Sequence, residues 1–176
     1  FALRVFQRLD STLNLNRLLE DGSTICSGNS AAEIDGSVAS ILKAERTAIN
    51  IVQHLSGIAT LTKRYVEAVD GYEVRILDTR KTTVGLRYIE KHAVRSGGGD
   101  NHRFNLGGSI LVKDNHIKAL KSMGFGMEDI ARNALIQSNG DHEVEIEVEC
   151  VSEFQEVLKA GAKRILLDNM SIDEMR

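Results

Sequence analysis

The stretch EVEIEVE at residues 143–149 alternates acidic side chains with aliphatic ones. Successive side chains of a β-strand point to opposite faces, so the four glutamates share one face and the aliphatic residues share the other. If the aliphatic face packs on helices, the acidic face points into the interior of a barrel. The alternative is an edge strand with a solvated acidic face, and the stretch by itself leaves both interpretations open.

Four other short runs, each at the end of a β-like stretch, carry ionisable residues. They are DTRKTT at 78–83, GGGDNHR at 97–103, LVKDNH at 111–116 and LLDN at 166–169. Active sites of α/β barrels lie at the C-terminal ends of the strands. The runs therefore predict a barrel mouth that holds anions and a metal, and they favour an enzyme over a binding module.

Strand-like and helix-like segments alternate in the second half of the chain. We expect strands at 72–77, 110–112, 142–148 and 164–167, and helices at 85–94, 127–137 and 152–160. This alternation predicts parallel strand pairing with right-handed crossovers.

The N-terminal part has a different pattern. Turn residues between positions 21 and 36 predict short strands of a small sheet. Ser37 is expected to cap a helix that Ser56-Gly57 ends, and a second helix is expected up to Val69. We place the boundary between this small piece and the barrel-like part near Asn50.

The composition excludes several classes of partner. A net charge of −3, from 22 basic and 25 acidic residues, shows no global excess of either sign, so we expect no nucleic acid and no membrane as partners. The two cysteines, Cys26 and Cys150, lack metal-ligand spacing, which favours a reducing, cytoplasmic location. The absence of proline and of an initial Met predicts a fragment, an engineered sequence, or both.

Two basic residues follow the stretch VRIL and are candidates for anion binding. The guanidinium of Arg80 can grip a carboxylate or phosphate through two hydrogen bonds, and Lys81 supplies a mobile point charge. A solvated turn is the alternative interpretation. His102 and Arg103 follow three glycines that could let backbone amides approach a ligand, although such a run can also be only a flexible loop.

Further candidates end the later strands. Lys113 follows ILV, where a strand-end salt bridge is the alternative. Asp168 follows ILL and could bind a metal, a ribose hydroxyl or a helix N-terminus. The proposed mouth carries two more positive than negative charges, which predicts a polyanionic substrate; the residues counted are Arg80, Lys81, Arg103 and Lys113 against Glu147 and Asp168.

The combined strings resemble those of quinolinate phosphoribosyltransferase, the decarboxylating enzyme family of NAD biosynthesis. The matching text is AERTAINIVQHLSGIATLT at 44–62, ILDTRKTTVGLRYIEKHAVRSGGGDNHR at 76–103, ILVKDNHI at 110–117, VEIEVE at 144–149 and AGAKRILLDNMS at 160–171. The resemblance covers nearly the whole chain and is looser only in the first twenty residues.

The resemblance implies a transferase that joins quinolinate to phosphoribosyl pyrophosphate with Mg²⁺, giving nicotinate mononucleotide, pyrophosphate and CO₂. It also implies an α/β fold: a partial N-terminal open-faced sandwich in residues 1–49 and an incomplete six-stranded α/β barrel in residues 50–176. A head-to-tail homodimer is expected, in which Arg46 reaches the neighbouring site, and a hexamer is left open. Family members continue to a glycine-rich loop for the ribose 5-phosphate, so we expect the printed chain alone to be impaired.

The family motifs also assign substrate contacts by position. The residues expected to hold the quinolinate carboxylates are Arg80, His102, Arg103 and Lys113, with a hydroxyl donor from Thr79. Several Arg and Lys donors of this kind would also reject nicotinate, which lacks the second carboxylate and would leave buried cations unpaired.

Catalytic roles follow from the same resemblance. The catalytic residues are expected to be Lys81, Lys113, Glu147 and Asp168. Lys81 would contact phosphoribosyl pyrophosphate, while Glu147 and Asp168 would bind its ribose hydroxyls and the metal. Carboxylates near the sugar and cations near the phosphates would stabilise opposite charges that separate as pyrophosphate leaves.

Three alternatives remain at this stage. A nicotinate-using or transport-operon paralogue would have the same fold. A barrel aldolase would use Lys113 as a Schiff base. A non-catalytic fragment is the third.

Overall fold

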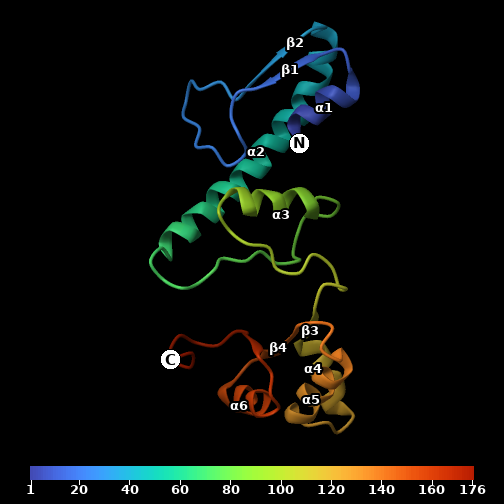
Figure 1. The fold of residues 1–176 in the computed structure, drawn as a ribbon, viewed down its shortest axis with the longest axis vertical. Helices are drawn as coiled ribbons and strands as arrows, with labels where there is room; N and C mark the ends of the chain where they lie inside the picture. Colours follow the sequence, from blue (N-terminus) through green and yellow to red (C-terminus); the bar gives the residue numbers. More distant parts are fainter. The chain divides into compact units, whose positions relative to one another are not determined.

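The computed structural model describes residues 1–176 and divides into two compact units, residues 1–102 and 103–176. Figure 1 colours the chain from one end to the other. The two units are described in turn.

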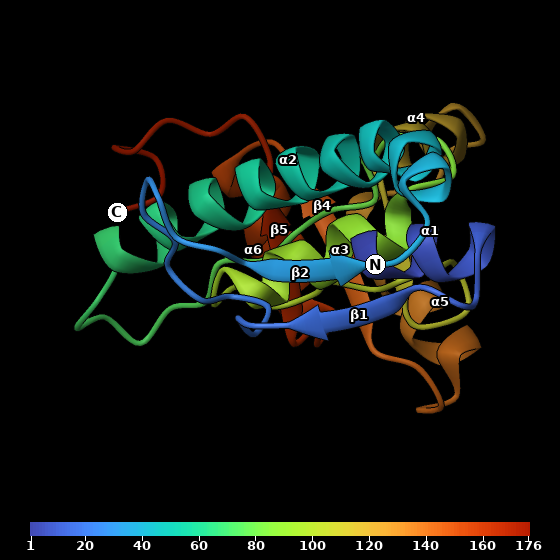
Figure 2. The ribbon, with the colours of Figure 1, turned by 90° about the horizontal axis from the view of Figure 1, so that it is seen from above.

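The first unit contains three helices and a two-stranded antiparallel sheet (Figure 1). In chain order its elements are α1 (Ala2–Leu9), β1 (Asn14–Arg17), β2 (Ala32–Asp35), α2 (Val38–Ala68) and α3 (Arg87–Ser96). Figure 2 shows β1 and β2 side by side with opposite directions. A small core joins the helices to the sheet; its buried members are Phe6, Leu13, Ala44 and Ala48.

Helix α2 begins as predicted but continues far beyond the expected end. The Ser37 hydroxyl accepts a hydrogen bond from the Ser40 amide at 3.4 Å, which confirms the cap. The predicted break at Ser56-Gly57 is wrong, because α2 runs without interruption to Ala68. A glycine inside a helix costs only about 1 kcal/mol relative to alanine, so favourable flanking turns and tertiary packing can carry the helix through it.

The glycine triplet after α3 packs against α2. A side chain on Gly97 would place its Cβ 2.3 Å from the carbonyl oxygen of Ala59, and one on Gly99 would lie 2.8 Å from Cγ2 of Thr62. Both glycines are buried. Two of these three glycines are therefore explained by the closeness of a helix, which is a different reason from the expected approach of a ligand.

The strand predicted at 72–77 is wrong. Only a single parallel bridge forms there, between Leu77 and Asp100. The Asp100 amide donates to the Ile76 carbonyl at 2.8 Å, and the Asp78 amide donates to the Asp100 carbonyl at 3.1 Å. A β-strand forms hydrogen bonds with several residues of a neighbouring strand, whereas here the backbone of Asp100 alone provides both the donor and the acceptor.

The second unit is a parallel three-stranded sheet with helices (Figure 1). Its elements are β3 (Ile110–Val112), α4 (Asp114–Ser122), α5 (Met127–Ser138), β4 (Val144–Val148), α6 (Val151–Lys159) and β5 (Arg164–Leu167). The strand order is β3-β4-β5, so β4 is central. The predicted strands at 110–112 and 164–167 are confirmed. The predicted strand at 142–148 and the predicted helices at 127–137 and 152–160 are confirmed with ends that differ by at most two residues.

The two faces of this sheet differ as the sequence pattern predicts. Ile146 and Val148 are fully buried and pack with helical residues such as Val157 and Ile130 in the main core of the unit. All five residues of β4 are buried, glutamates included. The alternative of a solvated edge strand is therefore wrong, and the acidic face is the face opposite the helices.

The mixed α/β class is confirmed, whereas the six-stranded barrel stays a prediction because the sheet of residues 103–176 has three strands and is open. The predicted boundary near Asn50 also stays a prediction; that residue lies inside α2, and the compact units divide after His102. None of the helices is long and apolar enough to cross a lipid bilayer.

Candidate active site

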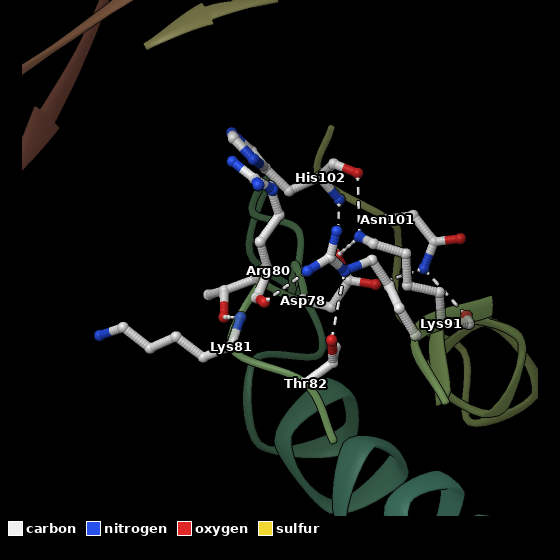
Figure 3. A network of polar contacts seen from close by, with 9 residues as sticks. Asp78, Arg80, Lys81, Thr82, Lys91, Asn101 and His102 are labelled. Carbon is white, nitrogen blue, oxygen red and sulfur yellow. Dashed lines mark hydrogen bonds and ion pairs between the residues drawn. The ribbon is translucent and has the colours of Figure 1, made fainter. Parts of the chain in front are cut away.

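A buried ion pair lies at the centre of the candidate site in the first unit. Lys91 of α3 donates to a carboxylate oxygen of Asp78, and only 3% and 8% of the two side chains are exposed (Figure 3). The same ammonium group donates to the carbonyl oxygen of His102 at 3.1 Å. Two segments that are distant in sequence, at Asp78 and at His102, are thus held by one lysine.

Two further donors complete this network. The His102 amide donates to Asp78 Oδ1 at 2.9 Å, and Asn101 Nδ2 donates to Asp78 Oδ2 at 2.6 Å (Figure 3). Asn101 Nδ2 also donates to the Lys91 carbonyl at 2.9 Å. Both oxygens of the Asp78 carboxylate are therefore occupied, which satisfies a buried charge that would otherwise be very costly.

The loop that follows Asp78 is fixed through its backbone. Arg87, at the start of α3, donates to the Arg80 carbonyl at 3.3 Å and to the Thr82 hydroxyl at 3.2 Å. The Lys81 amide donates to the Thr79 hydroxyl at 3.1 Å. These bonds use main-chain and hydroxyl groups, so they leave the basic side chains of the loop available.

The side chains of Arg80 and Lys81 make no hydrogen bond or ion pair with the protein. Lys81 is exposed, whereas Nε of Arg80 is buried and has no hydrogen-bond partner. In Figure 3 the Arg80 side chain and the His102 ring extend toward the same side of the loop. A buried guanidinium nitrogen without an acceptor can be satisfied by an anionic ligand.

Glu90 anchors the far end of the loop. Its carboxylate accepts from the Thr83 amide at 3.1 Å and lies 2.8 Å from Nε2 of His54 on α2. Burial raises the pKa of the Glu90 carboxyl, but the hydrogen bonds from Thr83 and His54 and the charge of His54 lower it further, so the pKa lies below its usual 4.5.

Replacing Glu90 by glutamine is expected to change the pH dependence of stability. A depressed pKa in the folded protein gives a stabilisation that is present above the unfolded pKa and is lost as the pH falls through the folded value. The free energy of unfolding of Glu90→Gln should therefore lie below that of the parent at pH 6, and the gap should narrow between pH 5 and pH 3. Urea titrations at several pH values measure this, and a gap that stays constant would contradict it.

In the second unit, three predicted site residues lie at the carboxyl edge of the sheet. Glu147 lies near the end of β4 and pairs with Leu166 of β5. Lys113 directly follows β3, and Asp168 directly follows β5, where its amide donates to the Val148 carbonyl at 2.9 Å. If the pairing of the strands is continued by one residue, Lys113 lies opposite Glu147, and Asp168 lies opposite Glu149. The side chains of Lys113, Glu147 and Asp168 then share the acidic face of the sheet, which is opposite the face that the helices cover.

A small pocket of about 70 Å³ opens at this edge, with Asp114, Lys118, Glu147 and Glu149 in its lining. The Asp114 amide donates to Glu147 Oε1 at 3.4 Å. Lys118 donates to Asp114 at 3.0 Å, and this hydrogen bond lowers the pKa of the Asp114 carboxyl. The other glutamate of β4, Glu145, is also buried and pairs with Arg164 at 3.4 Å.

The predicted metal ligands fit Mg²⁺ by their chemistry. Glu147 and Asp168 are carboxylates at the same edge of adjacent parallel strands. Mg²⁺ prefers hard oxygen ligands and is often held by one or two carboxylates together with waters and substrate phosphates. No group of three or more His, Cys, Asp or Glu side chains is arranged as a metal site in residues 1–176.

The predicted site residues therefore fall into two sets. Thr79, Arg80, Lys81 and His102 belong to the first unit, and Arg103, Lys113, Glu147 and Asp168 belong to the second. Arg103 donates to the Ser109 carbonyl at 2.9 Å. The convergence of the two sets on one ligand stays a prediction, as does the role of Arg46, which is exposed on α2.

Sequence reasoning missed the residues that hold the loop. Arg87, Glu90 and Lys91 were assigned only to a helix, and Asp78 was passed over although it precedes the basic pair. The spacing i, i+3 and i+4 places these three charged residues on one helix face, but such a face is usually solvated, and the burial of Glu90 and Lys91 is seen only in the structure.

Both parts of the chain match one class of enzyme, the phosphoribosyl transferases. The family model described as the C-terminal domain of quinolinate phosphoribosyl transferase matches residues 58–176, and the N-terminal domain model matches residues 1–56. The chain belongs to the quinolinate phosphoribosyl transferase family, which confirms the resemblance seen in the motifs.

Individual relatives agree with this assignment. A probable nicotinate-nucleotide pyrophosphorylase (carboxylating) of Synechocystis sp. is 40% identical over 174 residues, which are 99% of this chain and 58% of the relative. The crystal structure of NadC from Streptococcus pyogenes has a TM-score of 0.88 at 44% identity and covers 99% of this chain and 60% of that one. A NadC deletion mutant has a TM-score of 0.90 at 43% identity, covering 99% and 62%. The chain thus spans about three-fifths of the length of these relatives.

Proposed function

We propose that the protein containing this chain transfers a phosphoribosyl group from phosphoribosyl pyrophosphate to quinolinate and decarboxylates the product. Nicotinate mononucleotide, pyrophosphate and CO₂ would result, as a step in NAD biosynthesis. In the full protein, the three-stranded sheet would form part of a six-stranded α/β barrel.

One observation carries the substrate part of the proposal. Arg80 has a buried Nε with no acceptor in the protein, on a loop whose backbone is held by Arg87 and Glu90. A buried guanidinium nitrogen without an acceptor in the protein favours a ligand that brings an anionic oxygen. Quinolinate, with two carboxylates, is such a ligand, and His102, Arg103 and Lys113 would supply the remaining donors.

The carboxylates of the second unit fit the other end of the reaction. Positive charge grows on the ribose carbon as pyrophosphate leaves, and Glu147 and Asp168 would stabilise it from the sheet edge. When bound there, Mg²⁺ would supply charge neutralisation for the leaving phosphates. Lys81, which is exposed, would bind the same phosphates as a point charge.

Pyrophosphate release separates this proposal from its nearest alternative. With the full gene product and phosphoribosyl pyrophosphate, quinolinate should support turnover, and nicotinate should be slower by about 10⁴-fold in kcat/KM, because a site built around two carboxylates leaves buried cations unpaired with one. Equal rates would favour a nicotinate-using paralogue. Turnover with neither acid would overturn the proposed activity.

The remaining assignments belong to the same proposal. The enzyme would act as a homodimer in which Arg46 enters the neighbouring site, or as a hexamer built from three such dimers, and it would be cytoplasmic. Sedimentation of the full gene product measures the assembly. Borohydride trapping of a carbonyl substrate on Lys113 would instead favour the aldolase reading.

A further inference from the structure

We propose that Arg87, Glu90 and Lys91 are positioning residues that hold the loop of residues 78–83 so that Arg80 and Lys81 face the substrate. The inference rests on the proposed function and extends it to a helix face that touches no substrate. None of the three residues was among the predicted site residues.

The three side chains lie on one face of α3. Positions i, i+3 and i+4 of an α-helix are neighbours on its surface. Two of the three, Glu90 and Lys91, are buried with 8% and 3% exposure, an unusual place for charged residues. The buried charged face of α3 therefore needs partners, and the loop provides them.

Each of the three residues contacts a different part of the loop. Lys91 contacts its first residue, Asp78, through the buried ion pair. Arg87 contacts the middle of the loop, at the Arg80 carbonyl and the Thr82 hydroxyl. Glu90 contacts the end of the loop, at the Thr83 amide.

The loop has little internal structure that could hold it without α3. Within it, the Thr82 amide donates to the Arg80 carbonyl at 3.0 Å, and the Lys81 amide donates to the Thr79 hydroxyl. Neither bond fixes the loop to the rest of the fold. Asp78 is also held by Asp100, Asn101 and His102. In the rest of the loop, the side-chain hydrogen bonds that tie residues 80–83 to the fold come from Arg87 and Glu90, and none of them uses the side chain of Arg80 or Lys81.

Lys91 also links this loop to the second ligand segment. Its ammonium group bonds both the Asp78 carboxylate and the His102 carbonyl. The distance between the start of the basic loop and the His102 backbone is thus fixed by one buried group. A displacement of about 1 Å in a reactive arrangement can cost about 10²-fold in rate, so this spacing matters for a substrate held from both segments.

Arg87 offers the sharpest test because it contacts only the loop. Arg87→Met keeps the apolar stem and removes every donor. Arg95→Met is the matched control, since Arg95 is exposed on the same helix and its side chain makes no hydrogen bond or ion pair. Arg87→Lys retains one donor and should be intermediate.

Two readouts on the full gene product distinguish positioning from a purely structural role. First, kcat/KM for quinolinate should fall by about 10- to 100-fold in Arg87→Met, with Tm within about 3 °C of the parent. Second, hydrogen exchange of the ligand-free protein should quicken in peptides covering residues 78–86 and remain unchanged in peptides of residues 110–170. Arg95→Met should match the parent in both.

The outcomes separate this inference from the proposed function. A parent protein that turns over quinolinate, with an Arg87→Met variant indistinguishable from Arg95→Met, would overturn the inference alone. A variant whose activity falls only in proportion to its unfolded fraction would also overturn it, because that result describes stability. A parent protein inactive with quinolinate would overturn the proposed function, while faster exchange at 78–86 would still support the role of α3 in holding the loop.

Discussion

Replacing Lys91 by methionine is expected to destabilise the protein by about 3–5 kcal/mol, because it leaves the carboxylate of Asp78 buried without its cation. The methionine side chain fills a similar volume, so the loss reports the missing charge and the missing bond to the His102 carbonyl. Denaturant unfolding followed by circular dichroism measures the change in the free energy of unfolding.

Two controls make this result specific to the buried pair. Lys63→Met removes an ion pair with Glu67 that is more than half exposed, and it should cost no more than about 0.5 kcal/mol. The double variant Asp78→Asn, Lys91→Met removes both charges and should recover part of the loss, since no unpaired charge is left. A Lys91→Met variant as stable as Lys63→Met would show that the ion pair between Lys91 and Asp78 contributes less to stability than predicted.

Neutralising either carboxylate at the sheet edge is expected to lower kcat of the full gene product by about 10²–10³-fold. Glu147→Gln and Asp168→Asn keep the shape of each side chain and remove the charge that would stabilise the sugar in the transition state. Raising the Mg²⁺ concentration should recover part of the activity if these carboxylates also hold the ion. Initial rates of pyrophosphate release across a range of Mg²⁺ concentrations measure both effects.

The alternating stretch itself supplies the control. Glu143→Gln changes a glutamate of the same stretch that precedes β4 and pairs with Arg164 at the other end of the strand. Its rate should remain within about threefold of the parent, because charge effects fall steeply with distance when water and salt screen them. If all three variants lost activity equally, the acidic face would act through its total charge, and the assigned roles would be wrong.

Local patterns were enough to predict the three strands of the second unit and its helices α5 and α6. The residues of β3, β4 and β5 that the sequence pattern predicts to be the apolar face are the ones that pack against the helices. The glutamates on the opposite face were correctly separated from the core for the same reason. Helix α4 was missed, because its first residues, Asp114 to His116, were interpreted only as the end of a strand.

Tertiary contacts determine the features that the sequence pattern did not predict. The passage of α2 through Gly57 depends on packing that a local break signal does not contain. The network around Asp78 brings together residues 10 to 24 positions apart, and nothing in the spacing of single residues indicates which of them will pair. Family motifs located Arg80 and Lys81, whereas only the coordinates identified the helix that holds them.

The three adjacent glycines of the triplet are required for two different physical reasons. Gly97 and Gly99 are limited by room, since even the methyl group of alanine would collide with α2 or its side chains. Gly98 has space around it but a φ of +88°, so there the limit is the handedness of the backbone, which asparagine tolerates better than alanine does. The three positions therefore differ in what a designer could change: at Gly97 the obstacle is the backbone carbonyl of Ala59, which no side-chain substitution removes, at Gly99 it is first the side chain of Thr62, and at Gly98 a residue that tolerates the left-handed conformation is needed.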